Sequence, residues 1–327
     1  MWSAGLDRES DVTLQTPASL LDRAQVRWNE IGESQPDLVP TIALQRSLVA
    51  RTIAAVGRLS GSGPPAVSLE PEQVADKLCA GTPAFRGEPI TLPAAILGPL
   101  VLEACDDLAS GGAGGVARRV RTCLDDGRID MCSLLTASFD RDQNAIRVKA
   151  LHEGVAPDVL WLVAELAAGP AAYVAQRTLF TQTGIGPEPS VASALERWPR
   201  GCCPACGSWP AFGETVERSS LLRCSFCGLG WRPRDHGCTY CGAEPGHLTS
   251  LKADPGAAHQ AALCSSCGGY LKWLDVRAST PFELLPVEDL ASTPLDVLSV
   301  HQGFGRPSLP ELGGPERQPC KMVVSTP

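Results

Sequence analysis

The chain has 327 residues, of which 44% are hydrophobic and 20% charged, and its formal net charge at neutral pH is −8. No run of 18 or more apolar residues occurs and no basic stripe is present, so the composition argues against membrane insertion and against nucleic-acid binding. We therefore expect a soluble cytoplasmic protein that is long enough for two domains.

Residues 1–196 predict a helical bundle with little strand-like alternation. Thr16 and Pro17 supply an N-cap and a first-turn proline, after which apolar residues recur at helical spacing as far as Ile31. Similar patterns predict further helices over residues 40–59, 71–79, 116–124, 129–139, 158–168 and 171–180. Gly169-Pro170 is expected to separate the last two helices, because proline removes a backbone donor and clashes with the preceding turn.

Residues 184–199 contain three prolines and are predicted to be a linker into a different kind of sequence. Seven of the seventeen aromatic residues of the chain fall within residues 201–277. Short hairpins around metal sites have little core of their own, so we expect most of these rings to be buried.

Four Cys-x-x-Cys-Gly motifs, here called knuckles, follow one another in this aromatic region. Their cysteines are Cys203/Cys206, Cys224/Cys227, Cys238/Cys241 and Cys264/Cys267. Two thiolates at this spacing can hold one side of a tetrahedral ion, and the glycine can adopt the positive φ that directs backbone N–H groups at the sulfurs. Because two knuckles complete one four-sulfur site, the sequence predicts two metal ions, each bound by four cysteines.

Loop lengths favour pairing the first knuckle with the second and the third with the fourth. The stretches between successive knuckles contain seventeen, ten and twenty-two residues. The favoured pairing therefore closes two ordinary hairpin-sized loops. Alternating, cross-braced pairing stays open, because doubling a loop costs only about 0.6 kcal/mol.

Tetrahedral sulfur coordination suits iron and zinc alike. Zinc would make the sites structural, whereas iron could take up and release one electron. With eight ionised cysteines and two divalent ions, the net charge would become about −12. Disulfides and a thioredoxin-like redox motif are weaker interpretations, since no apolar signal segment opens the chain and a redox motif usually occurs once. The remaining six cysteines are expected to be buried or unused thiols.

A four-thiolate site leaves no position for water or substrate, which catalytic zinc requires. The chain also contains no Gly-x-x-x-x-Gly-Lys loop, no His-Glu-x-x-His motif and no nucleophile elbow. The sequence therefore predicts a protein that is not an enzyme.

Residues 282–302 predict one or two amphipathic helices, and a mobile tail rich in proline and glycine follows Gly303. We expect a helical domain over residues 1–196 and a tandem metal-ribbon domain over 197–279. Residues 280–327 are expected to form a C-terminal helical segment with a flexible tail.

The flanks of the knuckles resemble one known family. They read Cys-Pro-Ala-Cys-Gly-Ser-Trp-Pro from Cys203, Leu-Arg-Cys-Ser-Phe-Cys-Gly from Leu222, Cys-Thr-Tyr-Cys-Gly from Cys238 and Cys-Ser-Ser-Cys-Gly-Gly-Tyr-Leu-Lys from Cys264. With the leucine-rich acidic stretch from Val287, this order is similar to the formate dehydrogenase accessory proteins called FdhE. The likeness covers about residues 203–304, and the helical domain matches by class only.

This resemblance implies an α+β, multidomain fold: a helical N-terminal bundle, two rubredoxin-like or zinc-ribbon modules and a short C-terminal helical segment. It also implies a cytoplasmic, non-enzymatic factor that binds the catalytic subunit of a formate dehydrogenase and assists its maturation, with metal sites in which the family carries iron. An iron-containing electron carrier or redox sensor is the alternative. A nucleic-acid-binding ribbon protein is disfavoured by the acidic charge, and the sequence leaves open whether the chain forms a homodimer.

Overall fold

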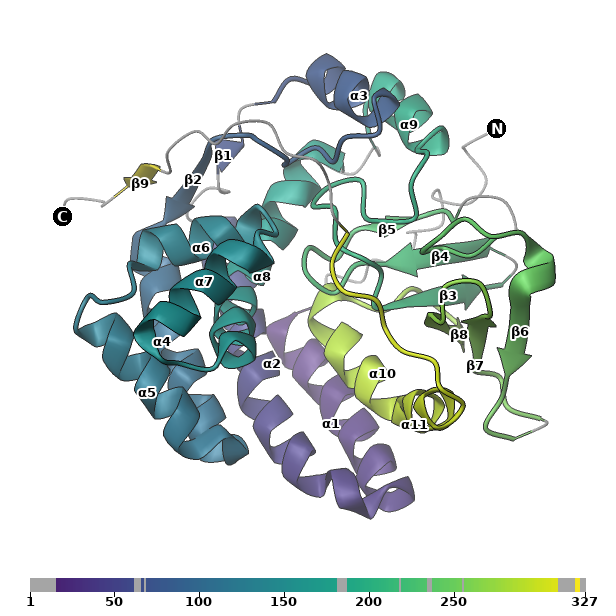
Figure 1. Ribbon diagram of the computed structural model, residues 1–327, viewed down its shortest axis with the longest axis horizontal. Coiled ribbons are helices and arrows are strands. Elements are labelled where there is room, and N and C mark those ends of the chain that lie inside the picture. Colours follow the sequence, from purple (N-terminus) through teal and green to yellow (C-terminus); the bar gives the residue numbers. More distant parts are fainter. Residues whose placement is uncertain are drawn as a thin grey trace.

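Helices and a β-sheet occupy opposite sides of the molecule, with the C-terminal helices beside both (Figure 1). The computed structural model describes residues 16–61, 66–67, 69–180, 187–217, 219–233, 237–254, 256–310 and 321–323. The predicted α+β architecture, with helices first and ribbon-like strands after them, is confirmed.

The described part of the helical region begins with a capped helix, as predicted. The Thr16 side chain accepts a hydrogen bond from the backbone N–H of Ser19 at 3.2 Å and starts α1. The helices of this region are α1 (Pro17–Ser34), η1 (Pro36–Leu38), α2 (Val39–Gly61), α3 (Pro71–Cys79), α4 (Ala94–Leu108), η2 (Ala109–Ala113), α5 (Gly114–Asp125), α6 (Met131–Phe139), α7 (Gln143–Glu153), α8 (Pro157–Phe180) and α9 (Pro189–Glu196). The six helices predicted for residues 40–180 therefore all have helical counterparts, although the last two prove to be one.

The predicted break at Gly169-Pro170 is wrong, because α8 runs through it without interruption. An interior proline costs about 3 kcal/mol, but this part of α8 is buried on all sides and the apolar surface that it removes from water outweighs that cost. A Cβ at Gly169 would lie 3.2 Å from the carbonyl oxygen of Phe226. The glycine thus allows the second knuckle to approach the helix closely.

By length and composition α8 could also cross a membrane. However, 61% of its apolar window is buried inside the molecule, as in the core helix of a soluble protein. This burial explains why the helix is apolar around most of its circumference.

The predicted linker contains a helix instead. Pro189 occupies the first turn of α9, where its missing N–H and fixed φ are favourable. Val191 and Ala194 are buried, and α9 lies beside α3 (Figure 1). The prediction took this proline as a break although proline also starts helices. The start of the predicted linker, residues 184–186, lies outside the described residues.

A small sheet that the sequence analysis did not predict flanks the helices. It has the order β1-β2-β9 and consists of β1 (Ala66–Val67), β2 (Ile90–Pro93) and β9 (Lys321–Val323). Strand β2 pairs antiparallel with β1 and parallel with β9. Two of these strands are too short to show an alternating pattern in the sequence.

The large sheet joins both ribbons in the order β5-β4-β3-β8-β7-β6. Its strands are β3 (Phe212–Val216), β4 (Ser219–Arg223), β5 (Gly230–Trp231), β6 (Leu248–Leu251), β7 (Gln260–Cys264) and β8 (Tyr270–Val276). Each ribbon is an antiparallel meander, and the parallel pair β3–β8 connects them from Gly213↔Trp273 to Val216↔Val276. A Cβ at Gly213 would lie 2.4 Å from the Trp273 ring, so this glycine lets the ring lie against β3.

The predicted C-terminal helices are present as η4 (Phe282–Leu284), α10 (Leu285–Ala291) and α11 (Thr293–His301). A further short helix, η3 (Pro245–His247), lies between β5 and β6 in the chain. Helix α10 packs on α1 and α2, while α11 packs on β7 and β8 (Figure 1). Most of the predicted tail, residues 311–320 and 324–327, lies outside the described residues.

One hydrophobic cluster extends from α2 through α8 into the first ribbon. It contains the four cysteines of the first two knuckles together with Phe85 from the helical part and Phe212 from β3. A second cluster holds α1, α2 and α10 together, and a third holds α11 against the sheet. Although the domain boundaries at residues 196 and 279 stay predictions, the core crosses the first of them.

Candidate metal centres

All four knuckles share one backbone geometry. In each, the glycine N–H donates to the carbonyl oxygen of the first cysteine at 2.8 or 2.9 Å. The φ angles are +83°, +72°, +73° and +68° at Gly207, Gly228, Gly242 and Gly268. This is the left-handed region that only glycine enters without strain, as predicted from the spacing.

The sulfurs assemble into two groups of four, pairing the first knuckle with the second and the third with the fourth. The first cluster contains Cys203, Cys206, Cys224 and Cys227, and the second contains Cys238, Cys241, Cys264 and Cys267. Within each cluster all four sulfurs lie within 4.8 Å of one another. The knuckles therefore pair as the loop lengths favoured. The cross-braced pairing is not the one that the structure shows.

The spacing of the sulfurs fits a tetrahedral ion. Metal–sulfur bonds of about 2.3 Å at tetrahedral angles place neighbouring sulfurs about 3.8 Å apart. Cys238–Cys267 and Cys241–Cys264 are 3.8 Å apart, and Cys203–Cys227 and Cys206–Cys224 are 3.5 Å apart. Either zinc or iron(II) matches such a set of donors.

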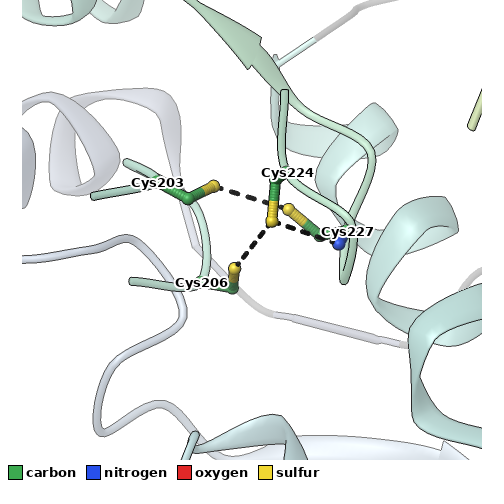
Figure 2. A group of neighbouring side chains, drawn as sticks. All are labelled: Cys203, Cys206, Cys224 and Cys227. Atoms are coloured by element: carbon green, nitrogen blue, oxygen red, sulfur yellow. Dashed lines mark hydrogen bonds between the residues drawn. The ribbon is translucent and has the colours of Figure 1, made fainter. Parts of the chain in front are cut away.

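The first cluster is buried in the main core. Figure 2 shows its four side chains converging from two loops, and none of them is more than 5% exposed. Backbone N–H groups of Ala84 and Phe85 donate to the carbonyls of Pro204 and Ala205 at 2.8 and 2.9 Å. The loop after α3 thereby holds the first knuckle in place.

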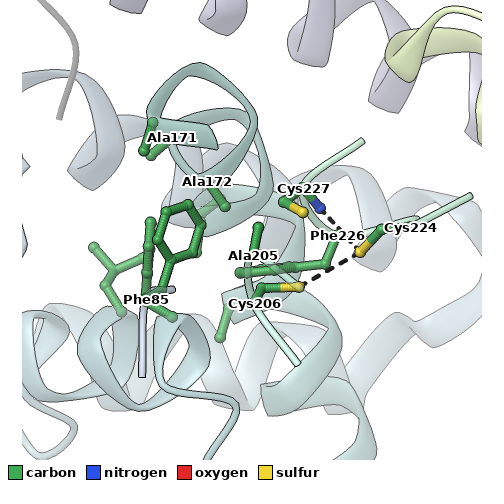
Figure 3. Packing of buried hydrophobic residues seen from close by; sticks show 14 of the residues in the cluster. Phe85, Ala171, Ala172, Ala205, Cys206, Cys224, Phe226 and Cys227 are labelled. Carbon is green, nitrogen blue, oxygen red and sulfur yellow. Dashed lines mark hydrogen bonds between the residues drawn. The ribbon is translucent and has the colours of Figure 1, made fainter. Parts of the chain in front are cut away.

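The second knuckle packs on α8 and its neighbours. The Phe226 ring meets the Phe139 ring edge-on, with centroids 6.1 Å apart. Figure 3 shows Phe226 among the buried side chains near Cys206, Cys224 and Cys227. A Cβ at Gly228 would lie 2.7 Å from the Tyr173 ring and 2.9 Å from the Phe282 ring. Helices therefore close this side of the first cluster.

Arg141 lies beside the first cluster, and sequence reasoning missed it. Its guanidinium carbon is 4.1 Å from the ring centre of Phe226 and 4.6 Å from that of Trp161, and it pairs with Glu165. A site of four thiolates with a divalent ion carries a net charge of about −2, so a cation held here compensates part of that charge. Nothing in the local sequence marks this arginine, since only the folded chain brings it to the cluster.

Burial controls the protonation of the first cluster when no ion is bound. It raises the pKa of Cys203 and Cys227 well above the ordinary value. Burial opposes ionisation of Cys206 as well, but hydrogen bonds from the other three thiols and the charge of Arg141 lower its pKa. The buried position of these thiols therefore opposes ionisation at Cys203 and Cys227, whereas the surroundings of Cys206 favour its thiolate.

The second cluster lies at the end of the sheet and is partly open. Cys238 and Cys264 are buried, whereas Cys241 and Cys267 are exposed. Burial raises the pKa of Cys238 to about 12. For Cys264 burial acts in the same direction, but backbone N–H groups of Cys267 and Ser266 outweigh it and lower the pKa to about 7.

The two clusters adjoin each other. Gly201, before the first knuckle, leaves no room for a side chain, since a Cβ there would lie 1.7 Å from the carbonyl oxygen of Thr239 in the third knuckle. The rings of Trp209 and Tyr240 meet edge-on with centroids 5.2 Å apart. The expectation that most aromatic rings of this region are core is confirmed, because Phe212, Phe226, Trp231 and Tyr270 are buried.

A charged network next to the second cluster was also missed. Lys272, fully buried in β8, contacts carboxylate oxygens of Asp289 at 2.8 Å and Asp296 at 2.7 Å. Arg306 pairs with the same two carboxylates at 2.8 and 3.0 Å, and the Tyr270 hydroxyl donates to Asp296 at 2.8 Å. A lysine with apolar residues on both sides, in Tyr-Leu-Lys-Trp-Leu from Tyr270, was the available signal.

The other cysteines in the described part of the chain take no part in either cluster. Cys105, Cys123 and Cys202 are buried, Cys132 is half-buried and Cys79 is exposed. Burial raises the pKa of Cys105 and Cys202 to about 12, so both are inert thiols. Cys320 lies outside the described residues.

About a third of the chain aligns with curated proteins named FdhE. FdhE homologues from Aquifex aeolicus and Pseudomonas aeruginosa are 32% and 36% identical over 115 and 129 residues, which is 33% and 36% of this chain and 40% of each relative. FdhE from Escherichia coli is 34% identical over 116 residues, 34% of this chain and 37% of that protein. The chain thus spans about two fifths of the length of the curated relatives that it matches.

The fold extends the likeness beyond these aligned segments. The crystal structure of FdhE from Pseudomonas aeruginosa superposes with a TM-score of 0.54 and 24% identity, covering 89% of this chain and 94% of that one. No protein-family model matches the chain. Sequence over about a third of the chain, together with fold over most of it, confirms the resemblance drawn from the knuckles and relates this protein to the FdhE family.

Proposed function

We propose that this protein is a formate dehydrogenase accessory protein that acts in the cytoplasm. It binds the catalytic subunit of the dehydrogenase and assists its maturation without catalysing a reaction of its own. The observation that carries the proposal is the similarity to curated proteins named FdhE. The fold shared with the crystal structure of FdhE from Pseudomonas aeruginosa supports it, and in this chain that fold brings the knuckle cysteines together in two groups of four.

The proposed metal ligands are the eight knuckle cysteines, four for each ion. Their sulfur spacing supports this assignment, and so do the left-handed glycines that follow each pair. With all four positions of the ion taken by protein sulfurs, a substrate has no vacant site to enter, which supports a non-enzymatic role. The ion stabilises the ribbon and, if it is iron, can also carry an electron.

Co-purification of the dehydrogenase catalytic subunit, the proposed client, with this protein tests the proposed function. A tagged copy of this protein, purified anaerobically from cells that produce the candidate formate dehydrogenase, should retain the catalytic subunit. A variant with Cys224→Ser and Cys227→Ser should recover less, because the first cluster organises the core between the two parts of the molecule. A Cys79→Ser variant is the matched control, since that thiol is exposed and lies outside both clusters.

Folding of each variant is checked by circular dichroism and gel filtration before the comparison. Equal recovery by bait and untagged control would contradict client binding. If the double variant is misfolded, Cys267→Ser at the exposed second cluster provides the same comparison with less disturbance of the core.

A second candidate is an electron carrier or redox sensor, which the open second cluster favours. Sulfur ligands that reach the surface shorten the path for electron transfer to a partner, and Cys241 and Cys267 are exposed. Anaerobically purified protein would then contain iron and show thiolate-to-iron absorption that bleaches on reduction. Colourless protein with stoichiometric zinc would eliminate this candidate.

A further inference from the structure

The two clusters have opposite relations to solvent. Every cysteine of the first is buried, whereas the second exposes its outer pair, Cys241 and Cys267. A Cβ at Gly242 or Gly268, the glycines of the second cluster's own knuckles, would meet nothing within 4 Å. A competing ligand can therefore approach the second cluster from solvent but cannot reach the first while the core is closed.

A short C-terminal segment, residues 304–308, lies against the fourth knuckle, and we call it the strap. Gly305 forms a parallel β-bridge with Gly269. Its N–H donates to the carbonyl of Gly268 at 2.9 Å, and its own carbonyl accepts from the N–H of Tyr270 at 3.2 Å. These bonds attach the strap to the residues that directly follow Cys267.

Further contacts hold Arg306 and Ser308 of the strap. Arg306 pairs with Asp289 and Asp296, and the indole N–H of Trp209 donates to the Ser308 carbonyl at 2.7 Å. Trp209 in turn packs on Tyr240 of the third knuckle. The strap thus contacts the fourth knuckle directly and is connected to the third through Trp209.

We propose that the second cluster is an exchangeable metal site whose occupancy holds the strap in place, while the first cluster keeps its ion. This inference rests on the proposed binding of metal by both clusters. Loss of the ion from the second cluster removes the four metal–sulfur bonds that join the two knuckles and leaves weaker links such as the hydrogen bond from the Tyr240 hydroxyl to the Tyr270 carbonyl. The Gly268–Gly269 edge then shifts and its bonds to Gly305 break. The released strap exposes that edge and the Trp209 indole, giving the end of the sheet a metal-dependent surface.

Thermodynamic linkage makes this coupling reciprocal. If the ion stabilises the bound strap, the bound strap must stabilise the ion by the same free energy. Weakening the strap at a residue that binds no metal should therefore speed loss of the ion from the second cluster. Arg306 is such a residue, since its contacts are with Asp289, Asp296 and the Tyr270 ring.

The test follows metal loss and strap mobility in the same sample. Zinc-loaded full-length protein is mixed with excess EDTA without oxygen, and bound ions are counted over time by native mass spectrometry. One ion should leave more than about tenfold faster than the other, because release of the slower one needs opening of the core. Hydrogen exchange in residues 304–308 should accelerate together with loss of the faster ion.

Three variants assign the phases. Cys267→Ser should abolish the fast phase and keep the slow one, and Arg306→Gln should speed only the fast phase by several-fold. Cys79→Ser, an exposed thiol outside both clusters, should change neither phase.

Other outcomes decide against the inference in distinct ways. Loss of both ions at one rate, or unchanged strap protection after the faster ion leaves, would overturn it while leaving the proposed accessory function intact. A chain that binds no zinc and no iron would overturn both this inference and the proposed metal sites.

Discussion

The glycines after the knuckles share a backbone conformation but have different surroundings. Gly228 and Gly242 have φ values of +72° and +73°. Tyr173 and Phe282 crowd Gly228, whereas nothing lies within 4 Å of a Cβ at Gly242. Comparing a substitution at Gly228 with the same substitution at Gly242 therefore separates the free-energy cost of backbone strain from that of steric crowding.

We expect Gly228→Ala to destabilise the protein clearly more than Gly242→Ala. Both substitutions impose about 1–2 kcal/mol of left-handed strain. Only the first also forces a methyl group into packed rings, which adds about 1–3 kcal/mol. Anaerobic urea denaturation of metal-loaded protein measures the difference, and equal midpoints would show that the packing at Gly228 can yield.

Lys272 is a fully buried charge with two carboxylate partners. We expect Lys272→Met to cost about 3 kcal/mol, the low end for breaking a buried ion pair, because Asp289 and Asp296 keep part of their hydration. Thermal or urea unfolding measures this loss. A neutral result would show that Arg306 alone can neutralise both carboxylates.

The matched control is Lys149→Met. Lys149 pairs with Glu153 one helical turn away at 2.7 Å, but its side chain is 40% exposed. A pair of this kind contributes about 0.3–0.5 kcal/mol, so the control should unfold almost like the unaltered protein.

At the scale of the element, α8 depends on a glycine that intrinsic helix propensity would replace. A Cβ at Gly169 would lie 3.2 Å from the carbonyl oxygen of Phe226 in the second knuckle. A Cβ at Gly57 in α2 would have nothing within 4 Å. Alanine is favoured over glycine in a helix by about 1 kcal/mol. Tertiary contact and local propensity therefore act in opposite directions at Gly169 and not at Gly57.

We expect Gly57→Ala to stabilise the protein by up to about 1 kcal/mol. Gly169→Ala should instead destabilise it, because the carbonyl of Phe226 belongs to a knuckle that can move only with the first cluster. Thermal unfolding of the two variants side by side tests the opposite signs. A stabilised Gly169→Ala protein would show that α8 and the second knuckle are not tightly apposed.

At the scale of the whole molecule, metal binding is expected to depend on pH. Burial raises the pKa of Cys203 and Cys227, and that of Cys238 to about 12, so these thiols keep their protons at neutral pH until a metal displaces them. Apparent affinity should rise with pH, by up to about tenfold per unit for each proton released. Anaerobic competition titrations at two pH values measure this slope.

The sign follows from which state holds the protons. Raised pKa values mean that the metal-free chain binds more protons than the loaded chain, so acid favours the metal-free chain. Affinity that does not change with pH would mean that the thiols are already ionised before the metal arrives, contrary to their burial.

Local signals predicted local features well. Thr16 caps α1, and the knuckle glycines have the left-handed φ that their position after Cys-x-x-Cys requires. Loop length favoured the observed grouping of the knuckles, because hairpin closure is a short-range property of the chain. By contrast, the breaks predicted from Pro170 and Pro189 were wrong, since proline ends a helix only when packing and its position in the turn allow it.

The sequence by itself determined the four Cys-x-x-Cys pairs and the succession of helices before ribbons, because both are patterns of short range along the chain. It favoured the grouping of the knuckles that the structure shows but left the cross-braced grouping open, since loop length changes the closure free energy only slightly. Tertiary structure alone decided that β3 and β8 join the ribbons in one sheet, that Arg141 and Lys272 lie beside the clusters, and that one cluster is buried while the other is open. Those features depend on burial of surfaces contributed by residues far apart in the chain. No local pattern encodes such burial, because its free energy exists only once the distant segments have packed together.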